Sequence, residues 1–323
     1  MAMRRLLPAL LVAVLVVPAT ATARDVRSAI FFYPWYSNRA HDGEYAHWQQ
    51  NGHAPPFDIA SAFFPARGAY SSADPRVLRA QMREIASAHV DEVVSSWWGW
   101  GSLEDERLPA VLRAARRQRL TVAVQLEPYL GRSLATIASD LRHLRDSGIG
   151  DVYVYRAEDF SAEDWSRLNL RLSGLRVFAQ TSRVGFAARA GFSGFYTYDI
   201  LEYGGAKFGR FCGQAHAAGI LCAPSVGPGY FAYRSNGDPR VKPRDRGATY
   251  DCMWRAALDA RADLVTITSY NEWGEGTQIE PAGRRGRYES YDGAYGLRGR
   301  AAERAYLHRT AYWTTRLAAA RRH

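Results

Sequence analysis

The sequence predicts an α/β protein built as a single (β/α)8 TIM barrel, and three observations support this fold class. Short β-branched or aromatic runs alternate with amphipathic helical patterns along the chain. The strand runs are apolar throughout, as expected for a parallel sheet that is covered on both faces. No linker, charge block or low-complexity stretch divides the 323 residues. Eight strand–helix units with short connections are most simply closed into one barrel.

The strand and helix patterns follow one another in a regular order. The eight expected strands are Ala29–Tyr36, Glu92–Trp98, Leu120–Leu126, Asp151–Tyr155, Arg176–Gln180, Gly194–Tyr198, Ile220–Ser225 and Asp263–Tyr270. The expected helices are Pro75–Ala88, Leu108–Gln118, Leu134–Asp146, Ala162–Leu172, a short one within Gly185–Gly191, Ala206–Ala218, Thr249–Ala260 and Ala301–Ala320. An open doubly wound sheet is the alternative, but no G-x-G-x-x-G loop follows an early strand.

The N-terminus has the layout of a secretory signal peptide. A basic start at Met1–Arg5 precedes the apolar run Leu6–Val17, and Ala21-Thr22-Ala23 supplies the small residues of a cleavage site. The alternative is a membrane anchor, but a run of about a dozen residues is too short to cross ~30 Å of hydrocarbon. We therefore expect residues 1–23 to be removed after Ala23 and residues 24–323 to form a secreted, extracellular catalytic domain.

Charge and composition give no indication of a nucleic-acid partner. The formal net charge is +10, and it falls to +8 when Arg4 and Arg5 leave with the signal peptide. The basic residues are almost all arginines that are scattered along predicted helices, and no zinc-finger, basic-helix or phosphate-loop motif accompanies them. We expect no nucleic-acid partner, no membrane span after signal removal, and a monomer.

Three cysteines, Cys212, Cys222 and Cys252, are an odd number for an exported chain. They are compatible with one disulfide and a buried thiol, or with three buried thiols. None stands in a C-x-x-C motif or beside a matching histidine. We therefore expect neither thiol catalysis nor a metal site, and no cofactor.

The residues just past the predicted strand ends are unusually polar and aromatic. A barrel brings the carboxyl ends of all its strands to one mouth, where the active site lies. Six separate segments should then converge on one cleft that is lined with aromatic rings and three acids. These segments are Tyr33–Tyr36, Trp97–Trp100, Glu127–Tyr129, Tyr196–Tyr198, Pro224–Tyr230 and Asn271–Glu275.

Two of the three acids stand close together after the last strand. Glu272 and Glu275 are separated only by Trp273-Gly274, on what should be a tight loop. Cleavage of a glycosidic bond needs one carboxyl group to protonate the leaving oxygen and a second to act as base or nucleophile. Two neighbouring carboxyl groups do not both ionise easily, so one pKa rises and the acid and base roles separate. The pattern predicts the catalytic pair of a glycoside hydrolase.

The string Tyr270–Pro281 closely resembles the signature of glycoside hydrolase family 99, the endo-α-mannosidases. The resemblance continues, in the same order along the chain, through Tyr33–Tyr36, Asp42–Trp48, Ser61–Asp74, Glu127–Tyr129, Gly194–Tyr198 and Pro224–Tyr230. It implies a (β/α)8 barrel, no metal, and retaining hydrolysis of an internal α-mannosidic bond in an oligo- or polysaccharide of mannan type.

The resemblance also implies an unusual mechanism. By position, Glu272 corresponds to the base that deprotonates the 2-hydroxyl of the sugar, which attacks C1 and gives a 1,2-anhydro sugar. Glu275 corresponds to the group that protonates the leaving group and later activates water. The 2-hydroxyl of an α-mannoside is trans to the leaving group, and an intramolecular nucleophile has a large effective molarity.

Further residues are candidates for substrate binding. Glu127 is expected to bind sugar hydroxyls, with a structural salt bridge as the alternative. Trp98 resembles the position that packs against the sugar one place beyond the cleavage site, and a core tryptophan is the alternative. His47 is either a hydrogen-bond donor to a sugar or a loop histidine, and Asn271 either orients Glu272 or caps the loop. Four tyrosines are expected to line the cleft: Tyr36, Tyr198, Tyr203 and Tyr230.

Two departures from the family pattern leave the substrate open. The family has Trp-His between the glutamates where this chain has Trp273-Gly274, and the loop 199–205 is shorter than usual. An endo-α-glucanase is one alternative, although the 2-hydroxyl of an α-glucoside is cis to its leaving group. A glycan-binding barrel without catalysis is another, and retention of both glutamates argues against it.

Overall fold

The strands form one parallel sheet in the computed structural model, which describes residues 27–320. The expected signal peptide lies outside these residues. The strands pair in the order β7-β6-β5-β4-β3-β2-β1-β11-β8, with every pairing parallel. Their bounds are β1 Ser28–Phe32, β2 Glu92–Trp97, β3 Thr121–Leu126, β4 Asp151–Val154, β5 Arg176–Gln180, β6 Gly194–Tyr196, β7 Leu221–Ala223, β8 Ser225–Val226 and β11 Val265–Ile267.

The two ends of this order are halves of one strand, and this closes the barrel. Only Pro224 separates β7 from β8. A proline has no N–H to donate to a ladder, so it interrupts the strand. Its carbonyl still accepts a hydrogen bond from the N–H of Thr266, at 3.1 Å. β7 pairs with β6 and β8 with β11, so the predicted strand Ile220–Ser225 occupies the seventh place in an eight-membered barrel. The predicted fold class is confirmed.

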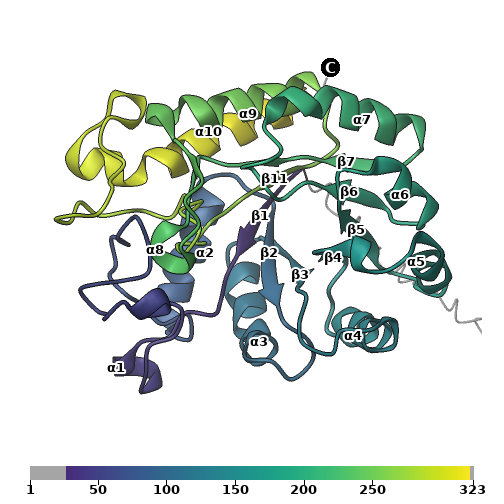
Figure 1. The fold of residues 1–323 in the computed structure, drawn as a ribbon, viewed down its shortest axis with the longest axis horizontal. Coiled ribbons are helices and arrows are strands. Elements are labelled where there is room, and N and C mark those ends of the chain that lie inside the picture. Colours follow the sequence, from purple (N-terminus) through teal and green to yellow (C-terminus); the bar gives the residue numbers. More distant parts are fainter. Residues whose placement is uncertain (1–26, 321–323) are drawn as a thin grey trace, which may run out of the picture.

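Helices surround the strands in the expected alternation (Figure 1). Side-chain oxygens of Asp74, Ser102, Ser133 and Ser161 accept backbone N–H groups at the starts of the first four long helices. Within the described residues, no helix has the length and apolarity needed to cross a bilayer. The bounds are α2 Pro75–Ser87, α3 Leu103–Arg116, α4 Leu134–Asp146, α5 Ala162–Asn169, α6 Val184–Arg189, α7 Phe208–Ala217, α9 Ala248–Asp259 and α10 Ala305–Ala320.

Helix α3 begins five residues before the predicted start at Leu108. Ser102 caps it, and three acidic residues follow in its first turn. Negative charge near the positive end of the helix dipole stabilises this start. The apolar periodicity alone did not reveal it, because the first turn is charged.

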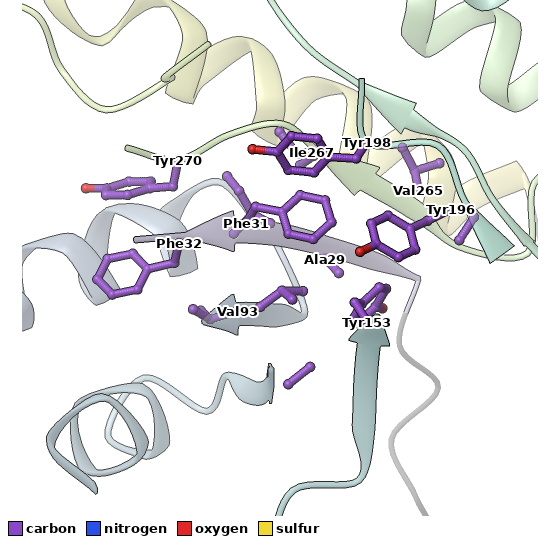
Figure 2. Close-up of a cluster of buried hydrophobic side chains, with 14 of the residues drawn as sticks. Ala29, Phe31, Phe32, Val93, Tyr153, Tyr196, Tyr198, Val265, Ile267 and Tyr270 are labelled. Atoms are coloured by element: carbon purple, nitrogen blue, oxygen red, sulfur yellow. The ribbon is translucent and has the colours of Figure 1, made fainter. Parts of the chain in front are cut away.

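Large side chains fill the barrel interior, so the barrel is a packed core (Figure 2). The ring of Tyr153 stacks on Phe178 at 4.9 Å and meets Phe31 edge-on at 5.9 Å. Its hydroxyl donates to the buried carboxyl group of Glu92 at 3.2 Å. Burial, with the charge of Asp151, raises the pKa of Glu92 to about 8. The barrel interior is therefore filled by packed side chains, with Tyr153 and Glu92 hydrogen-bonded to each other within it.

Two excursions at the mouth were not predicted. The first lies between β1 and α2 and includes the short helix α1 (Arg39–Asp42). The second follows β8 and contains a hairpin of β9 (Tyr230–Phe231) and β10 (Val241–Lys242), with α8 (Tyr233–Asn236) between them. The N–H of Phe231 donates to the carbonyl of Glu275 at 2.7 Å. The hairpin therefore lies directly against the loop that carries the predicted catalytic pair.

The cysteines form one disulfide, between Cys212 on α7 and Cys222 on β7, while Cys252 on α9 is exposed. The remaining thiol is thus not buried, contrary to both arrangements that the sequence left open. The bridge joins residues that are 10 positions apart.

Replacing Cys212 by alanine should lower the free energy of unfolding by about 2–3 kcal/mol, because the unfolded chain loses a loop closure. Thermal unfolding followed by circular dichroism measures this, and Cys252→Ala is the matched control. Equal melting temperatures for the two variants would show that the bridge does not stabilise the fold.

Candidate active site

Asn271 ties the loop after β11 to the end of β1. Its side-chain oxygen accepts the N–H of Tyr33 at 2.8 Å, and its side-chain nitrogen donates to the Tyr33 carbonyl at 2.9 Å. The same nitrogen donates to the Tyr70 hydroxyl at 3.2 Å. The amide therefore pairs with the backbone as a neighbouring strand would, and it fixes where the following residue, Glu272, leaves the barrel.

Tyr36 lies beneath this loop. Its hydroxyl donates to the carbonyl of Asn271 at 3.1 Å and accepts the N–H of Trp273 at 3.0 Å. The ring stacks on Trp48 at 4.1 Å, and the residue is only 1% exposed. Because its hydroxyl is hydrogen-bonded to the backbone on either side of Glu272, Tyr36 positions the loop from below. It does not line the open cleft.

Glu280 is the centre of a second set of bonds that hold the loop. Its carboxylate accepts from the Trp273 indole N–H and the Tyr70 hydroxyl, both at 2.8 Å, and from Gln81 at 2.9 Å. The guanidinium of Arg67 lies 2.9 Å from the same carboxylate. Sequence reasoning passed over Glu280, because most of its partners, including Tyr70 and Gln81, stand far away in the chain. Its fully buried position makes it a structural anchor.

Glu272 is buried at the start of the loop. Its N–H donates to the Ser269 hydroxyl at 2.8 Å, and its carboxyl oxygen accepts the N–H of Gly274 at 3.0 Å. Burial raises the pKa of Glu272 well above its usual value, and the charge of Glu275 raises it further. Hydrogen bonds from the backbone at Gly274 and Glu275 act in the opposite direction.

Glu275 is half-buried and lines a pocket of about 170 Å³. Burial raises its pKa to about 7, aided by the charge of Asp199, while a hydrogen bond from the Tyr198 hydroxyl lowers it. The pocket is also lined by Tyr155, Tyr198, Asp199, Ile200, Leu201, Tyr230, Arg240, Thr268 and Thr277. Glu275 is thus the member of the pair that faces an open space at the mouth.

Glu127 joins the other two acids at the mouth, as the strand-end argument predicts. It follows β3, is buried, and accepts a hydrogen bond from the Ser96 hydroxyl at 2.8 Å. Burial raises its pKa to about 8, and the charge of Glu275 adds to this effect. Its hydrogen-bond partner is a neutral hydroxyl rather than a guanidinium, so the geometry favours the substrate-binding hypothesis over the salt bridge.

The other candidate tyrosines take different places. Tyr198 has a left-handed φ of 53°, and its hydroxyl pairs with that of Tyr33 beside Glu275. Tyr230 lines the same pocket and donates to Asp238 at 2.9 Å. Tyr203 instead donates to Ser182 at 3.3 Å, and its ring lies 6.1 Å from that of Phe211 on α7. The structure therefore brings Tyr198 and Tyr230 to the pocket and directs Tyr203 toward α7.

His47 and Trp98 occupy the rim. The His47 ring stacks on Trp35 at 4.3 Å, and burial lowers its pKa to about 4, aided by Arg107. It is therefore a neutral imidazole at neutral pH. Trp98 is 37% exposed, which removes it from the core and leaves it available to a ligand.

Gly274 is placed where a side chain would crowd the site. A Cβ there would lie 3.0 Å from the Glu272 carboxyl oxygen and 3.4 Å from Ser235 of α8. The Ser235 hydroxyl donates to the Gly274 carbonyl at 2.5 Å. The hairpin segment thus approaches the loop closely at the position where the sequence departs from the family pattern.

The chain is similar in sequence and in fold to several known proteins. The profile of a family described as "Glycosyl hydrolase family 99" matches residues 24–160 and 166–319. The "Glycoprotein endo-alpha-1,2-mannosidase-like protein" of Danio rerio is 32% identical over 316 residues, covering 78% of this chain and 70% of its own. The human protein of the same description is 30% identical over 314 residues, covering 78% and 68%. The structure of the GH99 endo-alpha-mannosidase from Bacteroides thetaiotaomicron superposes with a TM-score of 0.83 at 28% identity, covering 92% of this chain and 99% of that one.

Replacing Glu280 by alanine should lower the free energy of unfolding by about 3–5 kcal/mol, because it removes a fully buried carboxylate with four side-chain partners and leaves the partly buried Arg67 only Glu84 as a carboxylate partner. Urea denaturation measures the change. Glu289→Ala, at an exposed glutamate, is the control and should stay within about 0.5 kcal/mol of the wild type. Similar midpoints for the two variants would mean that Glu280 does not anchor the loop.

Proposed function

The chain belongs to glycosyl hydrolase family 99, and from this premise we propose that it is an endo-acting α-mannosidase that retains the configuration of the cleaved sugar. The observation that carries the proposal is the pair Glu272 and Glu275 on one anchored loop. One carboxyl group is buried under the loop backbone and the other faces the pocket. A bound α-mannoside can then meet a base and a proton donor at the same time.

The electrostatics support a division of roles. Both carboxyl groups have raised pKa values, and each ionised group disfavours ionisation of the other, so near neutral pH the pair retains a proton. When this proton is on Glu275, Glu272 is a carboxylate of increased basicity. A stronger base is better suited to remove a proton from a sugar hydroxyl.

The reaction then proceeds in two balanced steps. Glu272 takes the proton of the 2-hydroxyl, O2 attacks C1, and the bond from C1 to the leaving oxygen breaks as Glu275 protonates that oxygen. Water next attacks C1 of the anhydro sugar while Glu275 takes its proton, and O2 regains a proton from Glu272. Each step inverts C1, so the product keeps the original configuration.

The remaining acid and the tyrosines are assigned to substrate binding. Glu127 stands near Glu275 and offers a buried oxygen acceptor to sugar hydroxyls. Tyr198 and Tyr230 supply rings and hydroxyl groups around the pocket. Trp98 supplies an exposed ring on the side of the mouth formed by β2 and β3.

We assign the enzyme to the extracellular space. The signal-peptide pattern of residues 1–23 is the first argument for this. The disulfide between Cys212 and Cys222 is the second, since such bonds persist in oxidising compartments.

Incubation with α-mannans and α-glucans, followed by sizing of the products, should give oligosaccharides from mannan only. Release of single sugars would indicate exo action instead. Cleavage of glucan would favour the glucanase alternative, and absence of any product would favour a binding barrel. Nuclear magnetic resonance of the first products should show the α-anomer.

Replacing either glutamate by glutamine should give contrasting kinetics. Glu275→Gln removes the proton donor, so kcat/KM on a natural glycan should fall by roughly 10²–10⁴, with a much smaller loss on a substrate that has a good leaving group. Glu272→Gln removes the base that generates the nucleophile, and it should be slow on both substrates.

The pH profile and a 2-deoxy substrate provide the controls. Because the pKa values of both carboxyl groups are raised, that of Glu275 to about 7 and that of Glu272 well above its usual value, the pair keeps one shared proton near neutral pH, and kcat/KM should decrease at higher pH as this proton is lost. This alkaline decrease should disappear in Glu275→Gln with the activated substrate. Exchanged behaviour of the two variants would reverse the roles, and normal hydrolysis of a 2-deoxy mannoside would falsify the anhydro route.

A further inference from the structure

The loop between β2 and α3 exposes a second large ring at the barrel mouth. Trp98 is 37% exposed, and Trp100, two residues later, is 63% exposed. Single exposed apolar residues are common on proteins, but an exposed tryptophan beside a cleft is a frequent contact for ligands. The proposed mechanism assigns no role to Trp100.

The ring of Trp100 is held in place from behind. It stacks on His143 of α4, with ring centres 4.4 Å apart and planes within 12°. His143 contacts Asp105 of α3 at 3.0 Å, and the other oxygen of Asp105 accepts the N–H of Gly101 at 2.9 Å. The backbone N–H of Trp100 donates to Asp140. One face of the indole is therefore covered and fixed, and the other is open to solvent.

The loop that carries this ring begins at the end of β2, which is joined to the end of β3 where Glu127 stands. The N–H of Glu127 donates to the carbonyl of Trp97 at 3.0 Å, so the two strand ends are joined just before Trp98. Gly99 has a φ of 101°, and a Cβ there would lie 3.2 Å from the ring of Tyr129. The glycine lets the turn fold down onto Tyr129, so the loop that carries Trp98 and Trp100 lies against the segment that follows β3 and contains Glu127.

We propose that the open face of Trp100 is a sugar-stacking platform that binds a pyranose ring of a mannan chain beyond the unit bound at Trp98. This inference rests on the proposed function and extends it to long, polymeric substrates. A flat apolar ring with a solvent-exposed face suits the C–H face of a sugar. Because the stack on His143 already immobilises the ring, little conformational entropy is lost on binding.

The neighbouring charges favour a neutral ligand. Asp105 and Asp140 flank the platform, and Glu106 on the same loop side is exposed. Carboxylates repel phosphate and sulfate groups, so this surface does not suit a nucleic acid or an anionic polysaccharide. A neutral glycan carries no charge that these carboxylates would repel.

Kinetics on substrates of two lengths test the platform. The ratio of KM on polymeric mannan to KM on a short activated α-mannoside should rise roughly five- to tenfold in Trp100→Ala, the factor expected when one aromatic contact is lost. Trp100→Phe retains a ring and should leave the ratio within about twofold of the wild type. Tyr312→Ala, at an exposed aromatic residue on α10, is the matched control and should not change the ratio.

Failure of this inference can be separated from failure of the proposed function. If the wild type cleaves both substrates and Trp100→Ala leaves the KM ratio unchanged, the platform assignment is wrong. If the wild type cleaves no mannoside, the proposed function is wrong, and titration calorimetry of mannan with wild type and Trp100→Ala then decides on the platform. Equal affinities for the two chains, or weaker binding in the Tyr312→Ala control alone, would overturn it.

Discussion

The buried contact between Glu280 and Arg67 is the interaction on which the geometry of the mouth depends. It lies under the loop that carries both proposed catalytic glutamates. Glu280 also accepts a hydrogen bond at 2.8 Å from the indole N–H of Trp273, which stands between the two glutamates in the sequence. Leaving the buried Glu280 carboxylate without its partner is strongly unfavourable, so the loop cannot lift without losing stability. Asn271 and Tyr36 then fix the backbone on both sides of Glu272. A catalytic base placed in this way needs little reorganisation when substrate binds.

The buried acids at the mouth lower the stability of the folded state near neutral pH. Glu275 and Glu127 have pKa values raised from 4.5 to about 7 and about 8. Because the folded state binds these protons more tightly than the unfolded chain, their contribution to stability is present at low pH and is lost as the pH rises toward those values. The hydrogen bonds and the ion pair beneath the loop offset this loss of stability. This explains why a site that contains three acids rests on so many side-chain contacts.

The sequence predicts those features that depend on local patterns, and it misses those that depend on distant contacts. Apolar runs gave the strand and helix order, and polar strand ends gave the convergence of Glu127, Glu272 and Glu275. The break at Pro224 was missed because an isolated proline does not show whether both halves of a strand stay paired. Tyr36 and Glu280 were misjudged or passed over because their partners lie far away in the chain, Tyr36 being 235 residues from Asn271 and Glu280 210 residues from Tyr70. Tyr203 follows a strand end, but its hydroxyl turns to Ser182.

The two sides of the mouth are built in different ways, and this bears on specificity. On the β2 and β3 side, side chains such as His143 and Asp105 support exposed rings. On the other side, the hairpin segment is held to the catalytic loop by hydrogen bonds to backbone carbonyls, from the Phe231 N–H to Glu275 and from the Ser235 hydroxyl to Gly274. Glycine at 274 and 276 makes this close approach possible, since a Cβ at 276 would lie 2.9 Å from the Phe231 carbonyl. Because these hydrogen bonds involve the side chains of neither Tyr230 nor Arg240, these two residues, which line the pocket beside Glu275, can vary without disturbing the catalytic pair. Specificity on the side of the proposed acid can therefore change independently of the chemistry.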